Sequence, residues 1–194
     1  MIEHVRKIFF GLDIVGFNQT GRTDIACLDM RRGLYDALGR ALAAGSLEAE
    51  SYDLLDRGDG IMAVIDESVE LHTVASRVVP ALTSAIHEYN HSARPDAQIR
   101  LRAALHSGDV FRDDHGYVGR HVSHAFRLLD GPELRGTLAA SVAVLALAVS
   151  ESAWRELEPP TPGGPEFTSI LISTKERAAR AWVAEFGASP ALVG

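Results

Sequence analysis

The sequence contains little of what several classes of protein depend on. Its 194 residues include a single cysteine, Cys27, which excludes an internal disulfide framework and a cysteine-based metal site. Its apolar runs fall short of the roughly 20 residues that a membrane-spanning helix needs. The segment 1–7 is too polar and too short before the first predicted strand to be a secretory signal peptide. These features predict a cytoplasmic protein that has no membrane partner.

An excess of basic charge is also missing. The chain has 19 Lys and Arg residues against 26 Asp and Glu residues, a net charge of −7, whereas non-specific binding to nucleic acid requires a basic face. Nucleic acid is therefore not an expected partner, although a few well-placed cations would still hold a small anion. The proportions of hydrophobic residues (46%) and charged residues (23%) are those of a folded globular chain. At this length, residues 1–194 are expected to form one domain.

The periodicity of the apolar residues predicts how the chain alternates between strands and helices. Strands are predicted over residues 8–15, 48–55, 61–65, 98–110, 167–173 and 179–185. Helices are predicted over residues 28–44, 68–90 and 120–129, with Ser68 as the N-cap of the second, while 138–149 fits either a strand or a helix. The first six elements follow the order βαββαβ, the split βαβ or ferredoxin-like pattern. We therefore predict an α+β fold, a sheet with helices on one face, with additions at the C-terminus.

Two aspartates are placed where a carboxylate needs a partner. Asp13 lies inside an apolar strand, between Leu12 and Ile14, where an unpaired charge is costly. Asp59 lies between two glycines in the predicted hairpin turn at 56–60. If the first strand and this hairpin are neighbours in the sheet, the two carboxylates converge, and such a pair binds Mg²⁺ or Mn²⁺ together with substrate phosphates. The alternative is that Asp13 only ends a strand and Asp59 only decorates a turn.

The segment that follows Asp13 leads through Gly16 and Phe17 into a polar loop and then a helix. Backbone N–H groups at such a position bind phosphate groups, because they point toward the loop and the helix dipole favours negative charge there. A triphosphate-binding loop and a plain turn are both compatible with these residues.

Four segments, in the same order along the chain, resemble the motifs of class III nucleotide cyclases and together span most of the sequence. They are FGLDIVGF (10–17), RGDG (57–60), IRLRAALHSGDV (99–110) and GYVGRHVSHAFRL (116–128). The resemblance favours the metal-binding interpretation of Asp13 and Asp59, with the backbone carbonyl of Ile14 completing a site for two divalent ions, Mn²⁺ or Mg²⁺. It also implies a homodimer whose active sites lie between the two subunits.

The resemblance assigns further roles in binding a nucleoside triphosphate substrate. Arg102 and Lys175 match residues that contact the triphosphate, and Phe17, the last residue of the first motif, is predicted to bind the triphosphate through its backbone. Arg127 matches the arginine that stabilises charge on the α-phosphate during cyclisation. In such a dimer, Ser123, Arg127 and Lys175 face the aspartates of the other subunit.

Three positions depart from the usual pattern of the family, and all three concern the base or the ribose. Leu55 replaces the lysine that selects adenine, Gly116 replaces its acidic or threonine partner, and Ser123 replaces the asparagine that orients the ribose. Without the polar pair, the site is not expected to select adenine by the usual hydrogen bonds. The positions that match metal-binding and phosphate-binding residues are kept.

This combination resembles the stand-alone pyrimidine cyclases of bacterial Pycsar anti-phage systems. The resemblance implies that UTP, in preference to CTP, is converted to the 3′,5′-cyclic mononucleotide and pyrophosphate, and that a downstream cyclic-nucleotide-binding effector reads the product. Leu55 and Tyr52 would then shape a pocket for a one-ring base, although cross-strand packing explains Tyr52 equally well. The other functions that fit are a purine cyclase with an unconventional base pocket and a catalytically silent module that binds nucleotide or only dimerises.

Three histidines have a simpler interpretation. His121 and His124, three residues apart in a predicted helix, lack a nearby acid or cysteine partner in the sequence and are interpreted as surface or interface residues rather than metal ligands. His106, at the end of a predicted strand, is interpreted as a half-buried residue that makes hydrogen bonds.

Overall fold

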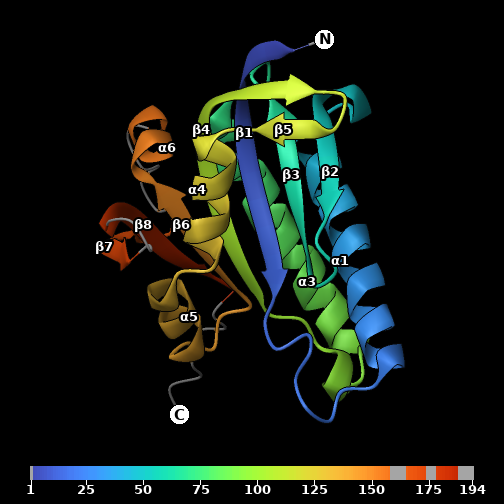
Figure 1. The fold of residues 1–194 in the computed structure, drawn as a ribbon. Coiled ribbons are helices and arrows are strands. Elements are labelled where there is room, and N and C mark those ends of the chain that lie inside the picture. Colours follow the sequence, from blue (N-terminus) through green and yellow to red (C-terminus); the bar gives the residue numbers. More distant parts are fainter. Residues whose placement is uncertain (1, 158–164, 174–177, 188–194) are drawn as a thin grey trace.

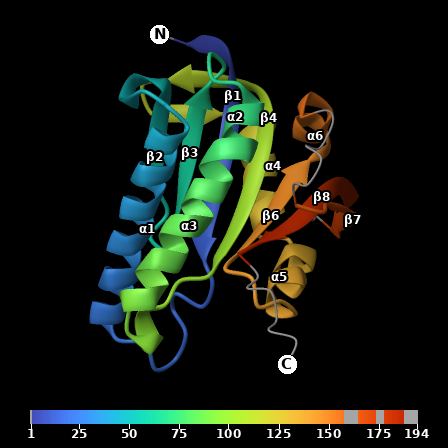
Figure 2. The same ribbon diagram turned by 180° about the vertical axis from the view of Figure 1, so that it is seen from behind.

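The computed structural model describes residues 2–157, 165–173 and 178–187. These residues form one mixed sheet of eight strands, with helices on both of its faces (Figure 1, Figure 2). Within these ranges, no helix is both long enough and apolar enough to cross a membrane. Lys175, which is predicted to bind the triphosphate, lies outside the described residues.

The sheet has the strand order β2-β3-β1-β4-β6-β8-β7, and β5 pairs with the C-terminal end of β4. The strands are β1 (Glu3–Ile14), β2 (Tyr52–Asp56), β3 (Gly60–Asp66), β4 (Leu101–Asp113), β5 (Gly116–Val118), β6 (Leu145–Ser150), β7 (Thr168–Ser173) and β8 (Ala178–Phe186). Paired strands are antiparallel except β4 and β6, which are parallel. The first four of these strands in sheet order form the split βαβ unit, and β6, β8 and β7 extend the sheet beyond β4. The predicted α+β fold is confirmed.

Helices α1 (Asp24–Ala44) and α3 (Val79–Ser92) cover one face of the sheet, which we call the α1/α3 face (Figure 2). A large apolar core lies between these helices and the strands. α1 begins after Thr23, whose side-chain oxygen accepts a hydrogen bond from the N–H of Ala26 at 3.2 Å. This bond satisfies one of the N–H groups that the first turn of a helix leaves without a partner.

The second predicted helix begins later than the sequence pattern indicates. α3 continues from α2 (Leu71–Thr73) and a π-helical turn (Val74–Val78), so the helical segment starts at residue 71. Ser68 does not cap it, because the Ser68 N–H donates to the Asp66 carboxylate at 3.1 Å in the preceding turn. The side chain of Asp66 thus competes for this stretch of backbone and delays the helix.

Helices α4 (Arg120–Leu129) and α5 (Pro132–Ala139) lie on the opposite face, which we call the α4 face (Figure 1). The prediction of helices on one face alone is wrong. The reason lies in β1, where every residue from Ile8 to Leu12 is buried. A strand that is buried on both faces has a continuous apolar run rather than an alternating pattern, and therefore needs cover on both sides.

The C-terminal half of the chain contains two elements that the sequence left open or hid. The stretch 138–149 divides between the end of α5 and β6, and α6 (Glu151–Glu156) follows. β5 has only three residues, too few for a recognisable alternation, and forms a two-stranded arm with the end of β4. The helix predicted over 120–129 is confirmed as α4 with the same bounds.

Candidate functional site

Asp13 lies one residue before the end of β1, on the α4 face. A Cβ atom at Gly11, two residues earlier, would lie 3.4 Å from Leu129 of α4, and residues two apart in a strand share a face. Backbone pairing places Asp13 opposite Gly60 of β3 and Arg102 of β4. The Asp13 side chain is 14% exposed, so its charge is largely removed from water. The central strand therefore holds this carboxylate between two neighbouring strands.

Asp59 reaches the same region from the turn between β2 and β3. The N–H of Ile14 donates to the Asp59 carbonyl oxygen at 2.9 Å, which fixes the turn against the end of β1. Two glycines allow this approach, because Gly58 has a φ of +83° and a Cβ atom at Gly60 would lie 2.2 Å from the carbonyl oxygen of Leu12. The structure thus brings the Asp59 hairpin next to Asp13, as the sequence pattern predicted.

Arg102 forms an ion pair with Asp13. Its Nε–H donates to Asp13 Oδ2 at 3.1 Å, and its Nη2 contacts the same oxygen. Burial nevertheless raises the pKa of Asp13 above its ordinary value; Arg102 lowers this pKa, while the charges of Asp59 and Asp130 raise it further. One guanidinium therefore offsets only part of the negative charge that gathers at this end of β1.

The oxygen donors at this position suit a hard divalent cation. Asp13 and Asp59 offer carboxylates, and Mg²⁺ and Mn²⁺ prefer such ligands. Among the described residues, no three His, Cys, Asp or Glu side chains converge as a metal-binding group. A cation held here would take few side-chain ligands and leave positions for substrate phosphates. The guanidinium of Arg102 already stands in for a cation beside Asp13, so the residues present fit a divalent ion.

Two further arginines hold the hairpin that carries Asp59. From α1, Nη1 of Arg31 donates to the carbonyl oxygen of Gly58 at 3.0 Å and to Asp56 Oδ1 at 2.9 Å. On the α4 side, the guanidinium carbon of Arg57 lies 4.3 Å from the centroid of the Phe126 ring, a cation–π contact. The sequence analysis missed both; the position of Arg57 beside the Gly-Asp-Gly turn was the available signal. The hairpin is thus tied to one helix on each face.

Ser123 and Arg127 lie on the outer side of α4. The helix packs on the sheet through its buried stripe of Ala125, Leu128 and Leu129. At 100° per residue, Ser123 and Arg127 fall on the side opposite that stripe. Ser123 is exposed and Arg127 is half-buried. The structure therefore places these two predicted site residues together, but on the side of α4 that points away from the sheet.

Leu55 and Tyr52 lie on opposite faces of β2. Leu55 is paired with Met62 and packs in the apolar cluster on the α4 face, whereas Tyr52 is paired with Ile65 and packs against the core under α1 and α3. Residues an odd number of positions apart in a strand point to opposite faces. The two side chains therefore do not share a face, and the packing of Tyr52 agrees with the cross-strand alternative. A role for Tyr52 beside a base stays a prediction.

Phe17 and Gly116 lie in connecting segments. Phe17 follows Gly16, which has a φ of +66°; its ring packs against the core of the α1/α3 face and its carbonyl oxygen accepts from Cys27 Sγ at 3.4 Å. A role for this turn in binding phosphate stays a prediction. Gly116 opens β5 opposite Asp113, with a φ of +127° that favours glycine.

A histidine cluster lies between β4 and α4. His106 is buried; its Nδ1 lies 2.7 Å from Ser150 Oγ, and its Nε2 lies 2.9 Å from His121 Nδ1. The ring centroids of His106 and His124 are 4.7 Å apart. Burial, with the charges of His124 and His121, lowers the pKa of His106 to about 3, and burial also lowers the pKa values of His121 and His124. Both α4 histidines are thus half-buried against the sheet rather than at the surface.

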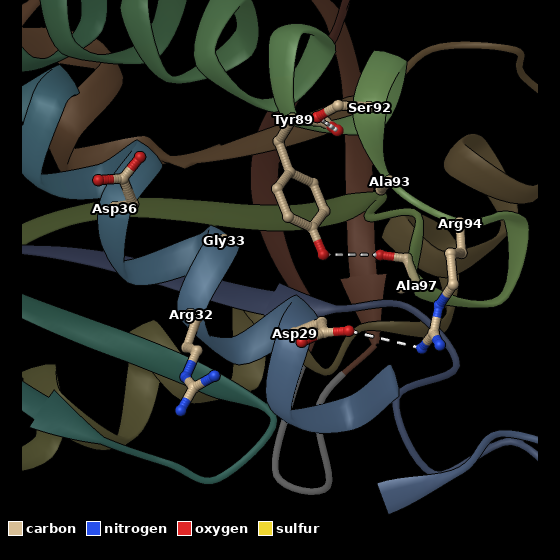
Figure 3. A pocket seen from close by; sticks show the side chains of 9 residues that line it. All are labelled: Asp29, Arg32, Gly33, Asp36, Tyr89, Ser92, Ala93, Arg94 and Ala97. Atoms are coloured by element: carbon tan, nitrogen blue, oxygen red, sulfur yellow. Dashed lines mark hydrogen bonds and ion pairs between the residues drawn. The ribbon is translucent and has the colours of Figure 1, made fainter. Parts of the chain in front are cut away.

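A hollow on the α1/α3 face lies away from these residues (Figure 3). It opens between α1 and the end of α3, beside Gly33. The Tyr89 hydroxyl donates to the carbonyl oxygen of Ala97 at 3.1 Å, and Arg94 lies 3.5 Å from Asp29, so these polar groups are paired with one another. Because the sheet separates the hollow from Asp13, the hollow is not part of the candidate site.

Comparison with known proteins identifies the fold. No protein-family model and no curated protein matches the sequence. Solved structures match over nearly the whole chain. The guanylyl cyclase Cya2 has a TM-score of 0.70 and 11% identity, with 98% of this chain and 96% of that chain covered. The adenylate/guanylate cyclase/hydrolase from Silicibacter pomeroyi has a TM-score of 0.70 and 21% identity, with coverages of 96% and 100%. The adenylyl cyclase CyaB from P. aeruginosa has a TM-score of 0.67 and 14% identity, and both chains are covered completely. The chain has the nucleotide cyclase fold.

Within this cyclase fold, the predicted site residues fall into two groups. Asp13 and Arg102 pair at the end of the central strands, and the turn that carries Asp59 lies beside them. Ser123 and Arg127 share the outer side of α4. The fold of one chain therefore brings the first group together, whereas it places the second group on the side of α4 that points away from the sheet.

Proposed function

We propose that this chain is a nucleotide cyclase that converts a pyrimidine nucleoside triphosphate, UTP in preference to CTP, to the 3′,5′-cyclic mononucleotide and pyrophosphate. The observation that carries the proposal is the convergence of Asp13 and Asp59 at the end of the central strand, in a chain with the nucleotide cyclase fold. Two carboxylates beside an arginine fit the binding of a metal-complexed triphosphate.

The residues of the hairpin region would position the reacting groups. Asp13 and Asp59, with the carbonyl of Ile14, would hold two divalent ions, Mn²⁺ or Mg²⁺. When bound, such ions offset phosphate charge and acidify the attacking 3′-hydroxyl group of the ribose. The 3′-hydroxyl group would lose its proton to solvent, and its oxygen would bond to the α-phosphorus while the bond from that phosphorus to the leaving oxygen breaks and pyrophosphate departs. Arg102 would pair with triphosphate oxygens, for which the planar guanidinium is suited.

A second copy of the chain would complete the site. Ser123 and Arg127 lie on the outer side of α4, where they can face another subunit. The arm formed by β4 and β5 carries the cross-strand pair Phe111 and Val118, which are 51% and 61% exposed. Exposed apolar side chains of this kind support an interface. In the homodimer, Arg127 would stabilise charge on the α-phosphate and Ser123 would contact the ribose, and Lys175 would bind the triphosphate.

The pyrimidine preference rests on the base-reading positions. Leu55 lies half-buried on the α4 face, the face that carries Asp13, and offers no hydrogen-bonding group to a purine. A cyclic pyrimidine nucleotide would act as a second messenger for a cyclic-nucleotide-binding effector in anti-phage defence. The alternatives are a purine cyclase with an atypical pocket and a silent module that binds nucleotide or dimerises.

The product assay distinguishes these functions. The purified chain is incubated with ATP, GTP, CTP or UTP and Mn²⁺, and cyclic mononucleotides are identified by mass. We expect cUMP as the main product and cCMP as a lesser one. A purine product would keep the cyclase proposal and overturn the base preference. The absence of any cyclic product, from protein that is folded and dimeric, would contradict the cyclase proposal and favour the silent module.

A further inference from the structure

In the ion pair between Asp13 and Arg102, the guanidinium binds the carboxylate that would bind metal under the proposed function. Both Nε and Nη2 of Arg102 converge on one oxygen, Oδ2 of Asp13. The two residues are direct cross-strand partners on β1 and β4, so their side chains meet without any distortion of the backbone. The contact therefore follows from the pairing of β1 with β4.

Burial separates this ion pair from the ion pairs of the surface. The side chains of Arg102 and Asp13 are each 14% exposed, whereas those of Arg31 and Asp56, which pair in the nearby hairpin, are 34% and 47% exposed. An exposed ion pair contributes little to the stability of the fold, because water solvates each of its charged groups when the pair separates. Removing one partner from a buried pair leaves an uncompensated charge, so each of these groups needs a replacement partner before it gives up the other.

Arg102 therefore competes with a cation for Asp13. A guanidinium is charged at every accessible pH and cannot escape by losing its proton. A divalent ion that arrives alone would have to displace the guanidinium from Oδ2 and leave it partly buried without an anion. A triphosphate that arrives with the ion offers oxygens that the guanidinium can bind in place of the carboxylate.

We propose that Arg102, besides binding the triphosphate, guards the metal site: it stays paired with Asp13 until a triphosphate offers it another anion, and so couples the binding of metal to the binding of nucleotide. This inference rests on the proposed function for the identity of the anion. Because coupling between two ligands is reciprocal, the triphosphate favours metal binding by the factor by which the metal favours the triphosphate. The free protein would then leave divalent ions largely unbound.

Binding of Mn²⁺ alone, without nucleotide, tests the guard. Free Mn²⁺ is measured by its electron paramagnetic resonance signal during titration of the wild type and of Arg102→Met and Arg102→Gln. Removal of the competing charge is expected to lower the dissociation constant of Mn²⁺ at this site by about tenfold, the equivalent of about 1.4 kcal/mol. Arg102→Gln has the same expected effect, because it keeps a hydrogen-bond donor while removing the charge. Circular dichroism and thermal unfolding identify which variants fold.

Two control variants define the site. Arg155→Met removes one positive charge from an exposed pair with Glu151 on α6 and is expected to bind Mn²⁺ as the wild type does. Asp13→Asn combined with Arg102→Met is expected to lose the gained affinity. If the folded Arg102 variants bind Mn²⁺ no better than Arg155→Met, the guard is refuted.

The guard and the proposed function fail in different ways. Formation of a cyclic nucleotide by the wild type, together with unchanged Mn²⁺ binding in the Arg102 variants, would refute the guard and leave the cyclase proposal intact. A gain in Mn²⁺ affinity that depends on Asp13, with no cyclic product from any of the four nucleotides, would support the competition at Asp13 and refute the cyclase proposal.

Discussion

The two groups of predicted site residues differ in whether contacts within the chain bring them together or leave them on an outward-facing side of a helix. At the end of β1, Arg102 pairs with Asp13, and the Ile14 N–H fixes the turn that carries Asp59. On α4, Ser123 and Arg127 lie on the side opposite the buried stripe, after an arm with exposed apolar side chains. Under the proposed function, the chain itself assembles the half of the site that would bind metal and triphosphate. It presents the other half outward, where a second copy would use it.

The largest expected effect concerns the assembled half. Asp13→Asn and Asp59→Asn should each lower the rate of cyclic nucleotide formation by about a thousandfold, because each removes a charge that holds the metal-complexed triphosphate. The rate is measured by mass spectrometry, and gel filtration checks that the dimer persists. Asp36→Asn, an exposed aspartate on α1, is the matched control and should keep the wild-type rate. Wild-type rates in both site variants would refute the assignment.

The next effect concerns the approach of the hairpin to β1. Gly60→Ala places a Cβ atom 2.2 Å from the carbonyl oxygen of Leu12, so the strands must separate. We expect a loss of about 2–3 kcal/mol in the free energy of unfolding, measured in urea, together with loss of product. Gly39→Ala, a helical glycine with no atom within 4 Å of the added Cβ, should instead gain up to about 1 kcal/mol. Equal stability of the two variants would contradict the close approach.

An effect of similar size concerns the packing of α4 on the sheet. The pKa of His106 is lowered from 6.5 to about 3 in the folded state, so between these values the unfolded chain binds the proton that the folded chain excludes. The free energy of unfolding therefore rises with pH through this window, by up to about 1.4 kcal/mol per pH unit for this residue. Above the window, the contribution of His106 to this free energy no longer changes with pH. His106→Gln should flatten this dependence between about pH 4 and pH 6. The exposed His115→Gln should keep the wild-type slope.

The smallest effect concerns the contact that joins the two halves. Arg57 of the hairpin stacks on Phe126 of α4. A double-mutant cycle of Arg57→Ala and Phe126→Leu should give a coupling of about 0.5–1 kcal/mol in the free energy of unfolding, since the contact is exposed to solvent on the Arg57 side. A coupling of zero would show that the hairpin and α4 are held independently.

Local patterns in the sequence predicted most of the strands and the nearness of the Asp59 turn to Asp13. The apolar run of β1, the Gly-Asp-Gly turn and the spacing of α4 depend on neighbouring residues, which periodicity reports directly. For Tyr52 the sequence left two roles open, and the odd spacing from Leu55 places the two side chains on opposite faces of β2.

The contacts that the sequence did not predict join residues far apart in the chain. The pair Arg102–Asp13, the stacking of Arg57 on Phe126 and the cluster of His106, His121 and His124 all depend on which strands and helices become neighbours. Their positions in the sequence carry no periodic signal for such partners. The order of the motifs indicated which segments form the site. The pairing of the strands shows which residues contact each other there.

The sharing of the site between two chains is tested most directly by purified mixed dimers of Asp13→Ala and Arg127→Ala, each inactive as a homodimer. In a shared site, both substitutions fall in one of the two sites and leave the other intact, so the mixed dimer should recover about half of the wild-type rate of cyclic nucleotide formation. A mixed dimer of Asp13→Ala and Asp59→Ala should stay inactive, because each chain then lacks its own carboxylate pair. If the first mixed dimer is as inactive as its parents, each site lies within one chain and the account is contradicted.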